Sequence, residues 1–140
     1  IEALYDAGKT KMIGISNVSA DQLTLLCARA VHKPMVVQNR CYAALGWDQD
    51  VRTVCRTHGI IYQGFSLLTA NRELFADPEV RAMAAKYGMG LAQLVFRFAM
   101  QTGMLPLTGT TDPQHMQEDL RSDQFTIAPD DLQRLEIIGM

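Results

Sequence analysis

Polar side chains follow short apolar runs at four places in the chain. Hydroxyl and carboxamide groups can both donate and accept hydrogen bonds, so a cluster of them suits a small polar ligand. Two alternatives stay open: such tips are polar where they face water, and Ser16 with Asn17 is also a common turn pair. The four polar groups are Ser16-Asn17, Gln38-Asn39, Ser66 and Thr108 to Thr111.

The three cysteines, Cys27, Cys41 and Cys55, are widely separated. No Cys-x-x-Cys pair and no Cys/His spacing typical of a zinc site occurs, so free thiols in a reducing compartment are expected. Cys41 falls near a strand tip, which leaves a reactive thiol there as an alternative. His32 and His58 lie near expected helix ends and are interpreted as surface or capping residues.

The apolar runs have the length of short buried strands, and each is followed by helical periodicity. Ser19 with Gln22 forms a capping-box pattern, and Asp-Pro pairs at 77–78 and 112–113 combine an N-cap with proline at the first helical position. Alternating strands and helices predict an α/β fold with a parallel sheet, whose strand tips share one rim. The expected strands are residues 12–16, 35–39, 60–65 and 104–107; the expected helices are one ending at residue 8, 20–31, 47 or 48 to 57, 78–87, 91–102, 113 to 120 or 121, and one from 129 to near 139.

Composition indicates one globular domain spanning residues 1–140, with 48% hydrophobic and 20% charged residues. A net charge of -2 gives no reason to expect nucleic acid or an anionic membrane surface as a partner. No apolar run approaches the roughly 20 residues of a membrane helix. Residues 1–6 resemble a helix end rather than a signal peptide, so a cytoplasmic location is expected.

The order of these motifs resembles the aldo-keto reductases. The resemblance covers essentially the whole chain but only the C-terminal half of the family's (β/α)8 TIM barrel, strands five to eight, so residues 1–140 are interpreted as a single partial domain. The matching motifs are Gly8-Lys9-x-Lys11-x-Ile13-Gly14-Ile15-Ser16-Asn17, Val36-Val37-Gln38, Gly59-Ile60-Ile61-x-x-Gly64-Phe65-Ser66-x-Leu68 and Pro113-x-His115-Met116-x-Glu118-Asp119.

The resemblance implies hydride transfer between a nicotinamide cofactor, usually NADP(H), and a carbonyl or alcohol. It also implies roles for individual residues. Phe65 corresponds to the aromatic residue, usually Tyr, that stacks on the nicotinamide. The other correspondences are Ser16, Asn17 and Gln38 to the carboxamide ligands, Ser66 and Leu68 to the loop over the pyrophosphate, Thr110 and His115 to the region of the 2′-phosphate, and Glu118 and Asp119 to a Glu-Asn pair at the adenine.

Two departures from the family pattern bear on cofactor choice. Gly109-Thr110 stands where many members have Lys-Ser, and His115 stands where many have Arg. Losing both cations removes fixed partners of a phosphate dianion, so NAD(H) is expected to be tolerated. Thr110, Thr111 and the helix N-terminus at 112–113 are alternative phosphate ligands.

The family's catalytic Asp, Tyr, Lys and His come from the first four barrel strands, and no residue here matches them. None of Tyr5, Tyr42, Tyr62 and Tyr87 corresponds to the catalytic Tyr. The favoured interpretation is a fragment of an NAD(P)(H)-dependent oxidoreductase that reduces aldehydes or ketones. The alternatives are a non-catalytic cofactor-binding or regulatory module of the same fold, and a gene remnant without function.

Four parallel strands cannot close an eight-stranded barrel, so two open sheet edges and an exposed apolar inner face are expected. The expected partners are therefore the missing N-terminal half or a second chain, which includes another copy of this one, together with a small-molecule carbonyl substrate. The stretch 40–46 is expected to be a rim loop. Arg40, Cys41, Tyr42 and Trp47 are candidates to line the substrate pocket, although Trp47 also suits packing at the start of its helix.

Overall fold

The computed structural model describes residues 1–140 and contains a single four-stranded sheet. All neighbouring strands pair in parallel in the order β1-β2-β3-β4, which confirms the expected parallel sheet with β1 and β4 as its open edges. The strands are β1 (Gly14–Ser16), β2 (Val36–Arg40), β3 (Ile61–Phe65) and β4 (Met104–Pro106).

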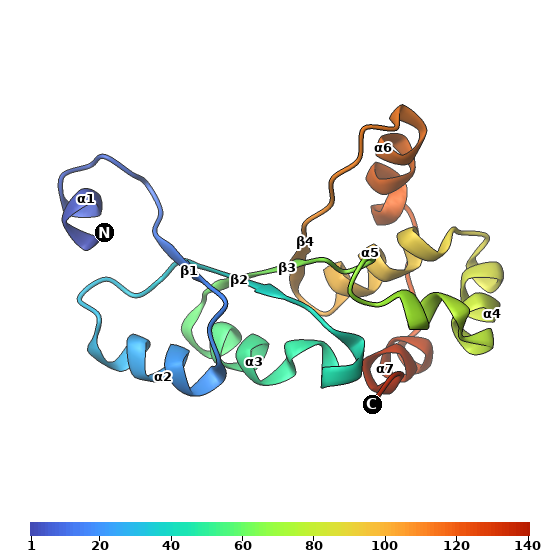
Figure 1. Ribbon diagram of the computed structural model, residues 1–140, viewed down its shortest axis with the longest axis horizontal. Coiled ribbons are helices and arrows are strands. Elements are labelled where there is room, and N and C mark those ends of the chain that lie inside the picture. The colour runs from blue at the N-terminus through green and yellow to red at the C-terminus, as the bar shows by residue number, and fades with distance from the viewer.

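Helices connect the strands and cover one side of the sheet. Helices α2 and α3 lie along that side, and the opposite side carries no helix between α1 and α6 (Figure 1). No helix is long and apolar enough to cross a membrane. The α-helices are α1 (Glu2–Asp6), α2 (Ala20–Arg29), α3 (Gln49–His58), α4 (Pro78–Tyr87), α5 (Leu91–Gln101), α6 (Pro113–Leu120) and α7 (Pro129–Ile137), and the 3-10 helices are η1 (Ala43–Asp48), η2 (Arg72–Ala76) and η3 (Arg121–Asp123).

Helices α2, α4 and α6 begin at the capping residues that the sequence predicts. Ser19 Oγ accepts a hydrogen bond from the backbone N–H of Gln22, and the Gln22 side chain accepts from the backbone N–H of Ser19. Asp77 caps α4 and Asp112 caps α6 by accepting backbone hydrogen bonds. Each cap accepts hydrogen bonds from amide groups that have no partner within the helix, which explains why the N-termini of these helices can be predicted from the local sequence.

Several expected element boundaries differ from the structure, such as the strand expected over 12–16, which begins only at Gly14, and two of the differences change the packing. The helix predicted over 20–31 ends at Arg29, because Ala30 adopts an extended conformation, and Val31 is 81% exposed instead of packing. The predicted loop over 40–46 is shorter: Arg40 continues β2, and η1 begins at Ala43. The side chain of Asn71 holds this stretch, since its Oδ1 accepts from the backbone N–H of Ala43 and its Nδ2 donates to the carbonyl of Cys41.

Trp47 is a core residue and does not line a substrate pocket. Its side chain is fully buried, its ring lies 4.8 Å from that of Phe98, and its indole N–H donates to the carbonyl of Leu135 at 2.8 Å. Trp47 and Asp48 both have φ near +55°, so α3 begins only at Gln49. The alternative interpretation, that Trp47 packs at the start of its helix, is therefore confirmed.

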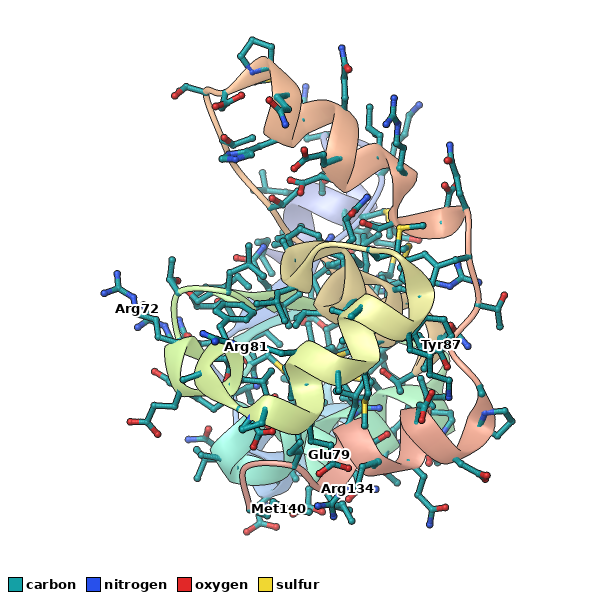
Figure 2. The ribbon with its side chains drawn as sticks, turned by 90° about the vertical axis from the view of Figure 1, so that its right-hand side faces the viewer. Arg72, Glu79, Arg81, Tyr87, Arg134 and Met140 are labelled. Carbon is teal, nitrogen blue, oxygen red and sulfur yellow. The ribbon has the colours of Figure 1, made fainter.

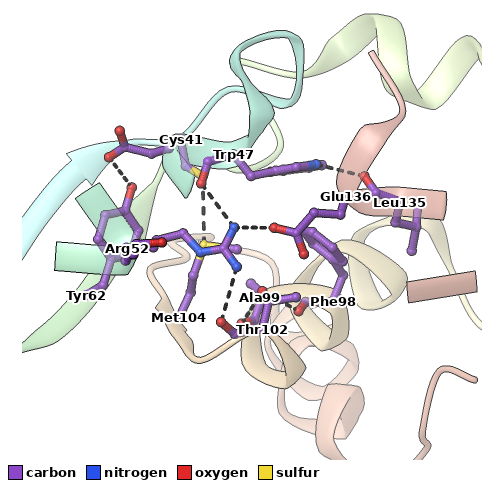
Figure 3. A network of polar contacts seen from close by, with 12 residues as sticks. Cys41, Trp47, Arg52, Tyr62, Phe98, Ala99, Thr102, Met104, Leu135 and Glu136 are labelled. Atoms are coloured by element: carbon purple, nitrogen blue, oxygen red, sulfur yellow. Dashed lines mark hydrogen bonds and ion pairs between the residues drawn. The ribbon is translucent and has the colours of Figure 1, made fainter. Parts of the chain in front are cut away.

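Arg52 of α3 links this helix to the C-terminal helix α7 through an ion pair. Its Nη1 donates to Glu136 Oε1 at 2.6 Å, and its Nη2 donates to the carbonyl of Thr102 at 3.2 Å (Figure 3). A second link joins α7 to α4, where Arg134 and Glu79 form a bidentate pair on the surface (Figure 2). Arg52 is only 7% exposed, so its ion pair is the better shielded of the two.

The short helix α1 is held by the segment between α2 and β2. His32 Nε2 lies 2.6 Å from Asp6 Oδ1, and the His32 backbone N–H donates to Glu2 Oε1. The His32 ring also packs against Tyr5, with centroids 4.8 Å apart. These contacts agree with the structural role expected for His32, and His58 is exposed at the end of α3.

Candidate functional site

Strand alternation divides each strand between the helix-covered side and the open side of the sheet. Val37 and Tyr62 are buried under the helices, so their neighbours Gln38 and Gln63 face the open side. The register aligns Ser16 with Gln38 and Gln38 with Gln63, which places three polar side chains in one row across β1, β2 and β3.

Hydrogen bonds join the members of this row. Ser16 Oγ donates to the carbonyl of Gln38 at 2.8 Å, and Gln38 Nε2 donates to Gln63 Oε1 at 3.1 Å. The Gln38 Oε1 and the Gln63 Nε2 have no partner within the chain. The row therefore presents one free amide acceptor and one free amide donor, which is the complementary set that a ligand carboxamide needs.

The open face is banded, which corrects the expectation of an apolar inner face. Val36 and the 45%-exposed Ile61 lie side by side one layer below the polar row, toward the strand N-termini. Arg40 and Phe65 lie side by side one layer above it, at the rim. A polar layer between two partly apolar ones distinguishes this face from an ordinary interface between layers of a hydrophobic core.

Gln63 was not among the residues singled out from the sequence, whereas Asn39 was. Asn39 is buried on the helix side, where its Oδ1 accepts from the backbone N–H of Val18 and its Nδ2 donates to Asp48 Oδ2. The rim role expected of Asn39 is therefore wrong. The signal for Gln63 was present: it is the one long polar side chain in the run 60–65 and lies two residues before Phe65, so it shares that ring's face.

Asn17 and Ser66 follow the ends of their strands with φ near +55° and +57°. The positive φ of Asn17 agrees with a turn at the end of β1. Neither Ser16 nor Asn17 bonds its own local backbone, however: the backbone N–H of Asn17 and the hydroxyl of Ser16 both donate to the carbonyl of Gln38 on the neighbouring strand. The Asn17 side chain has no hydrogen-bond partner and is exposed, which leaves its amide free for a ligand. Leu68 packs partly against the core, and Ser66 accepts a backbone hydrogen bond from Ala70.

Phe65 is half-buried and carries a cation on its ring. The Arg40 guanidinium carbon lies 5.4 Å from the ring centroid, within the range of a cation–π contact. Arg40 is exposed and pairs with no carboxylate. The ring expected to stack on a nicotinamide therefore lies next to an uncompensated positive charge.

The residues expected to hold the adenosine part lie together around α6. Thr108 Oγ1 donates to Asp119 Oδ2 at 2.7 Å, and the Gln114 amide donates to Glu118 Oε1 at 2.8 Å. His115 is exposed on the same helix. These residues are brought near one another, but they belong to a different edge of the sheet from Ser16, which lies on β1.

The N-terminus of α6 is already occupied by a carboxylate. Asp112 Oδ1 accepts from the backbone N–H groups of Gln114 and His115, and these bonds lower the pKa of Asp112. Thr110 Oγ1 in turn accepts from the backbone N–H of Asp112. The amides that the sequence offered as phosphate ligands are thus taken by an ionised side chain that repels phosphate.

None of the three cysteines is a reactive thiol by its surroundings. Burial raises the pKa of Cys41 to about 12 and that of Cys55 to about 11, and burial also raises the pKa of Cys27. Cys41 lies against Met104, with the two sulfurs 3.8 Å apart. The alternative of a reactive Cys41 is not supported, because the nucleophilic form of a thiol is the thiolate.

We expect the native chain to resist alkylation at all three cysteines. Because each folded pKa lies above the ordinary thiol value, thiolate is scarce at about pH 8 and increases only as the pH approaches the raised values. Mass spectrometry after iodoacetamide treatment should show no label in the folded chain and three labels after unfolding in urea. Rapid labelling of Cys41 in the folded chain at neutral pH would contradict the expectation.

Comparisons with known proteins agree with this architecture. The model of the Aldo/keto reductase family matches residues 1–72 and 70–139. Aldo-keto reductase family 1 member A1 of Xenopus tropicalis is 27% identical in an alignment 142 residues long, which covers 95% of this chain and 43% of the relative. An uncharacterised oxidoreductase of Schizosaccharomyces pombe is 31% identical over 136 residues, 96% of this chain and 47% of the relative.

Solved structures extend the comparison to the fold. A crystal structure of an aldo-keto reductase enzyme from a Medee basin deep-sea metagenome library superposes with a TM-score of 0.89 at 22% identity, covering 99% of this chain and 52% of that one. The chain thus spans about half the length of the relatives it matches. Its four parallel strands with alternating helices form the C-terminal half, strands five to eight, of a (β/α)8 barrel, and the chain belongs to the aldo/keto reductase family.

Proposed function

We propose that this chain provides the nicotinamide-binding wall of an NAD(P)(H)-dependent oxidoreductase that reduces aldehydes or ketones to alcohols. The observation that carries the proposal is the hydrogen-bonded row of Ser16, Gln38 and Gln63 with Phe65 one layer above it. The row offers a free donor and a free acceptor for a carboxamide, and Phe65 offers a flat apolar face for the attached ring.

The remaining residues fit the other parts of such a cofactor. The free amide of Asn17 adds a further carboxamide ligand beside Ser16. Ser66 and Leu68 begin the turn at the end of β3, where a pyrophosphate would cross the rim. Glu118 and Asp119 provide acceptors for the adenine amino group. When bound, the reduced nicotinamide supplies the hydride, while these side chains bind and orient it.

The chain contributes no evident proton donor to the open face. Burial raises the pKa of Tyr62, whose hydroxyl donates to Asp48 on the helix side at 2.7 Å. The Tyr87 hydroxyl is likewise engaged, with Asp131 and with the backbone N–H of Ala128. Protonation of a carbonyl would then fall to residues of a partner segment with four more strands, paired to the β1 and β4 edges.

The second candidate is a cofactor-binding or regulatory module without catalysis. The lack of a proton donor on the open face favours this second candidate, because a site that only binds a dinucleotide needs no general acid. The two candidates share the cofactor site and differ only in turnover. They are separated by what happens when a carbonyl substrate is added to the loaded protein.

Titration with NADH and NADPH tests the proposal. Calorimetry and the fluorescence of the reduced nicotinamide should both report saturable binding with a Kd on the order of micromolar. Gln38→Ala should weaken binding by about tenfold, because it removes a hydrogen bond to the ligand on the open face of the sheet, while Gln133→Ala on the exposed face of α7 should not weaken binding. Absence of binding, or equal behaviour of the two variants, would refute the site. If the cofactor does bind, turnover of a simple aldehyde by the loaded protein would favour the enzyme over the non-catalytic module.

A further inference from the structure

An unpaired arginine lies against the ring proposed to stack on the nicotinamide. Arg40 and Phe65 are directly paired positions of β2 and β3, and the guanidinium carbon is 5.4 Å from the ring centroid. The four ion pairs of the chain all involve other residues, so no carboxylate compensates this charge. Arg40 belongs to no part of the cofactor set described above and was not needed to build it.

The position of this charge matters because the two redox forms of a nicotinamide differ in charge. The oxidised ring is a pyridinium with a unit positive charge, whereas the reduced ring is neutral. A cation fixed beside the stacking ring repels the first and not the second, and the repulsion grows as the ring and its surroundings exclude water. A guanidinium is weakly hydrated, so it lies against an aromatic ring at little cost in desolvation.

We infer that Arg40 makes the site distinguish the redox state of the cofactor, so that the reduced form binds more tightly than the oxidised form. This inference rests on the proposed function, since it takes Phe65 as the nicotinamide platform. The consequence concerns occupancy: the reduced cofactor fills the site at a lower concentration than the oxidised one, and the oxidised product is released more readily. On the protein the same cation opposes the positive charge that hydride loss creates, so the bound cofactor is a weaker hydride donor than the free one.

A purely steric role for Arg40 makes a different prediction. If the guanidinium only covered the Phe65 ring, both redox forms would have to displace it, and its removal would tighten both equally. If Arg40 were an unrelated surface cation, its removal would change neither. The ratio of the two dissociation constants therefore isolates the charge effect from both alternatives.

The test measures by calorimetry the dissociation constants of NADH and NAD+, and of NADPH and NADP+, for four proteins. They are the parent chain, Arg40→Gln, Arg40→Lys and the control Arg56→Gln, which removes an equal charge on the helix side. Arg40→Gln should strengthen the binding of the oxidised form, relative to that of the reduced form, by about 3- to 30-fold. Arg40→Lys and Arg56→Gln should both keep the parent ratio of the dissociation constants of the oxidised and reduced forms. Raising the salt concentration should bring that ratio closer to one in the parent chain.

Two results would overturn the inference, and they are distinguishable. Binding of both forms with an unchanged ratio in Arg40→Gln would reject the charge role of Arg40 and leave the cofactor site standing. Failure of the parent chain to bind any of the four nucleotides would reject the proposed site and the inference together. Arg40 is exposed, so its replacement is not expected to impair folding.

Discussion

The Trp47→Ala variant should lose about 3–5 kcal/mol of unfolding free energy, the loss typical of removing a large aromatic side chain from a core. Trp47 is fully buried, packs on Phe98 and donates its indole N–H to the carbonyl of Leu135. The substitution leaves a cavity between α5 and α7 and an unpaired carbonyl. Such a loss is a large part of the 5–15 kcal/mol by which domains are usually stable.

Urea unfolding followed by far-ultraviolet circular dichroism measures the change, since the variant lacks the only tryptophan. Leu45→Ala is the matched control, because Leu45 lies in the same 3-10 helix but is 75% exposed, and it should stay within about 0.5 kcal/mol of the parent. Trp47→Phe should fall between them, as it keeps most of the packing and loses the hydrogen bond. A Trp47→Ala protein as stable as Leu45→Ala would show that this core does not hold α7.

The strand–helix order was predictable because its signals are local. The capping box at Ser19, the Asp-Pro pair at 77–78 and the apolar run at 12–16 each act within a few residues of the chain. The 3-10 helix η1 was not predictable in this way. Its first residue, Ala43, donates its backbone N–H to the side chain of Asn71, which lies 28 residues further along the chain and gives no local sign of that contact.

The candidate site was half predictable for a related reason. Ser16 and Gln38 were singled out, and the register brings them together. Gln63 was missed, and Arg40 was singled out only as a candidate to line the substrate pocket, because their roles depend on neighbours on other strands: Gln63 binds the Gln38 amide, and Arg40 covers Phe65. Alternation along one strand says which face a residue takes, but only the register between strands says what lies beside it there.

The largest change in ligand preference is expected at α6. The double variant Asp112→Asn with His115→Arg should bind NADPH about 10- to 100-fold more tightly than the parent, while its affinity for NADH should stay nearly unchanged. The parent offers the 2′-phosphate no fixed cation at His115 and an ionised carboxylate at Asp112. Arginine restores a bidentate phosphate partner, and asparagine removes the repelling charge while remaining a good N-cap.

The single variants separate the two contributions. His115→Arg alone should give most of the gain, because it adds the new hydrogen bonds, whereas Asp112→Asn should give a smaller gain that shrinks at high salt. Gln117→Arg supplies the control, since it places the same charge on an exposed position of the same helix. If Gln117→Arg matched His115→Arg, the gain would reflect general attraction rather than a phosphate site at the start of α6.

The parent chain provides the decisive comparison for cofactor choice. With the α6 amides capped by Asp112, and with glycine and histidine in place of two cations, its affinities for NADH and NADPH should lie within about tenfold of each other. A parent preference for NADPH beyond about 100-fold would mean that a phosphate ligand lies elsewhere, and Thr108, Thr110 and Thr111 around the β4 tip would be the next residues to replace. A parent that binds NADH more tightly would instead identify the acidic edge of α6 as the feature that excludes the phosphorylated cofactor.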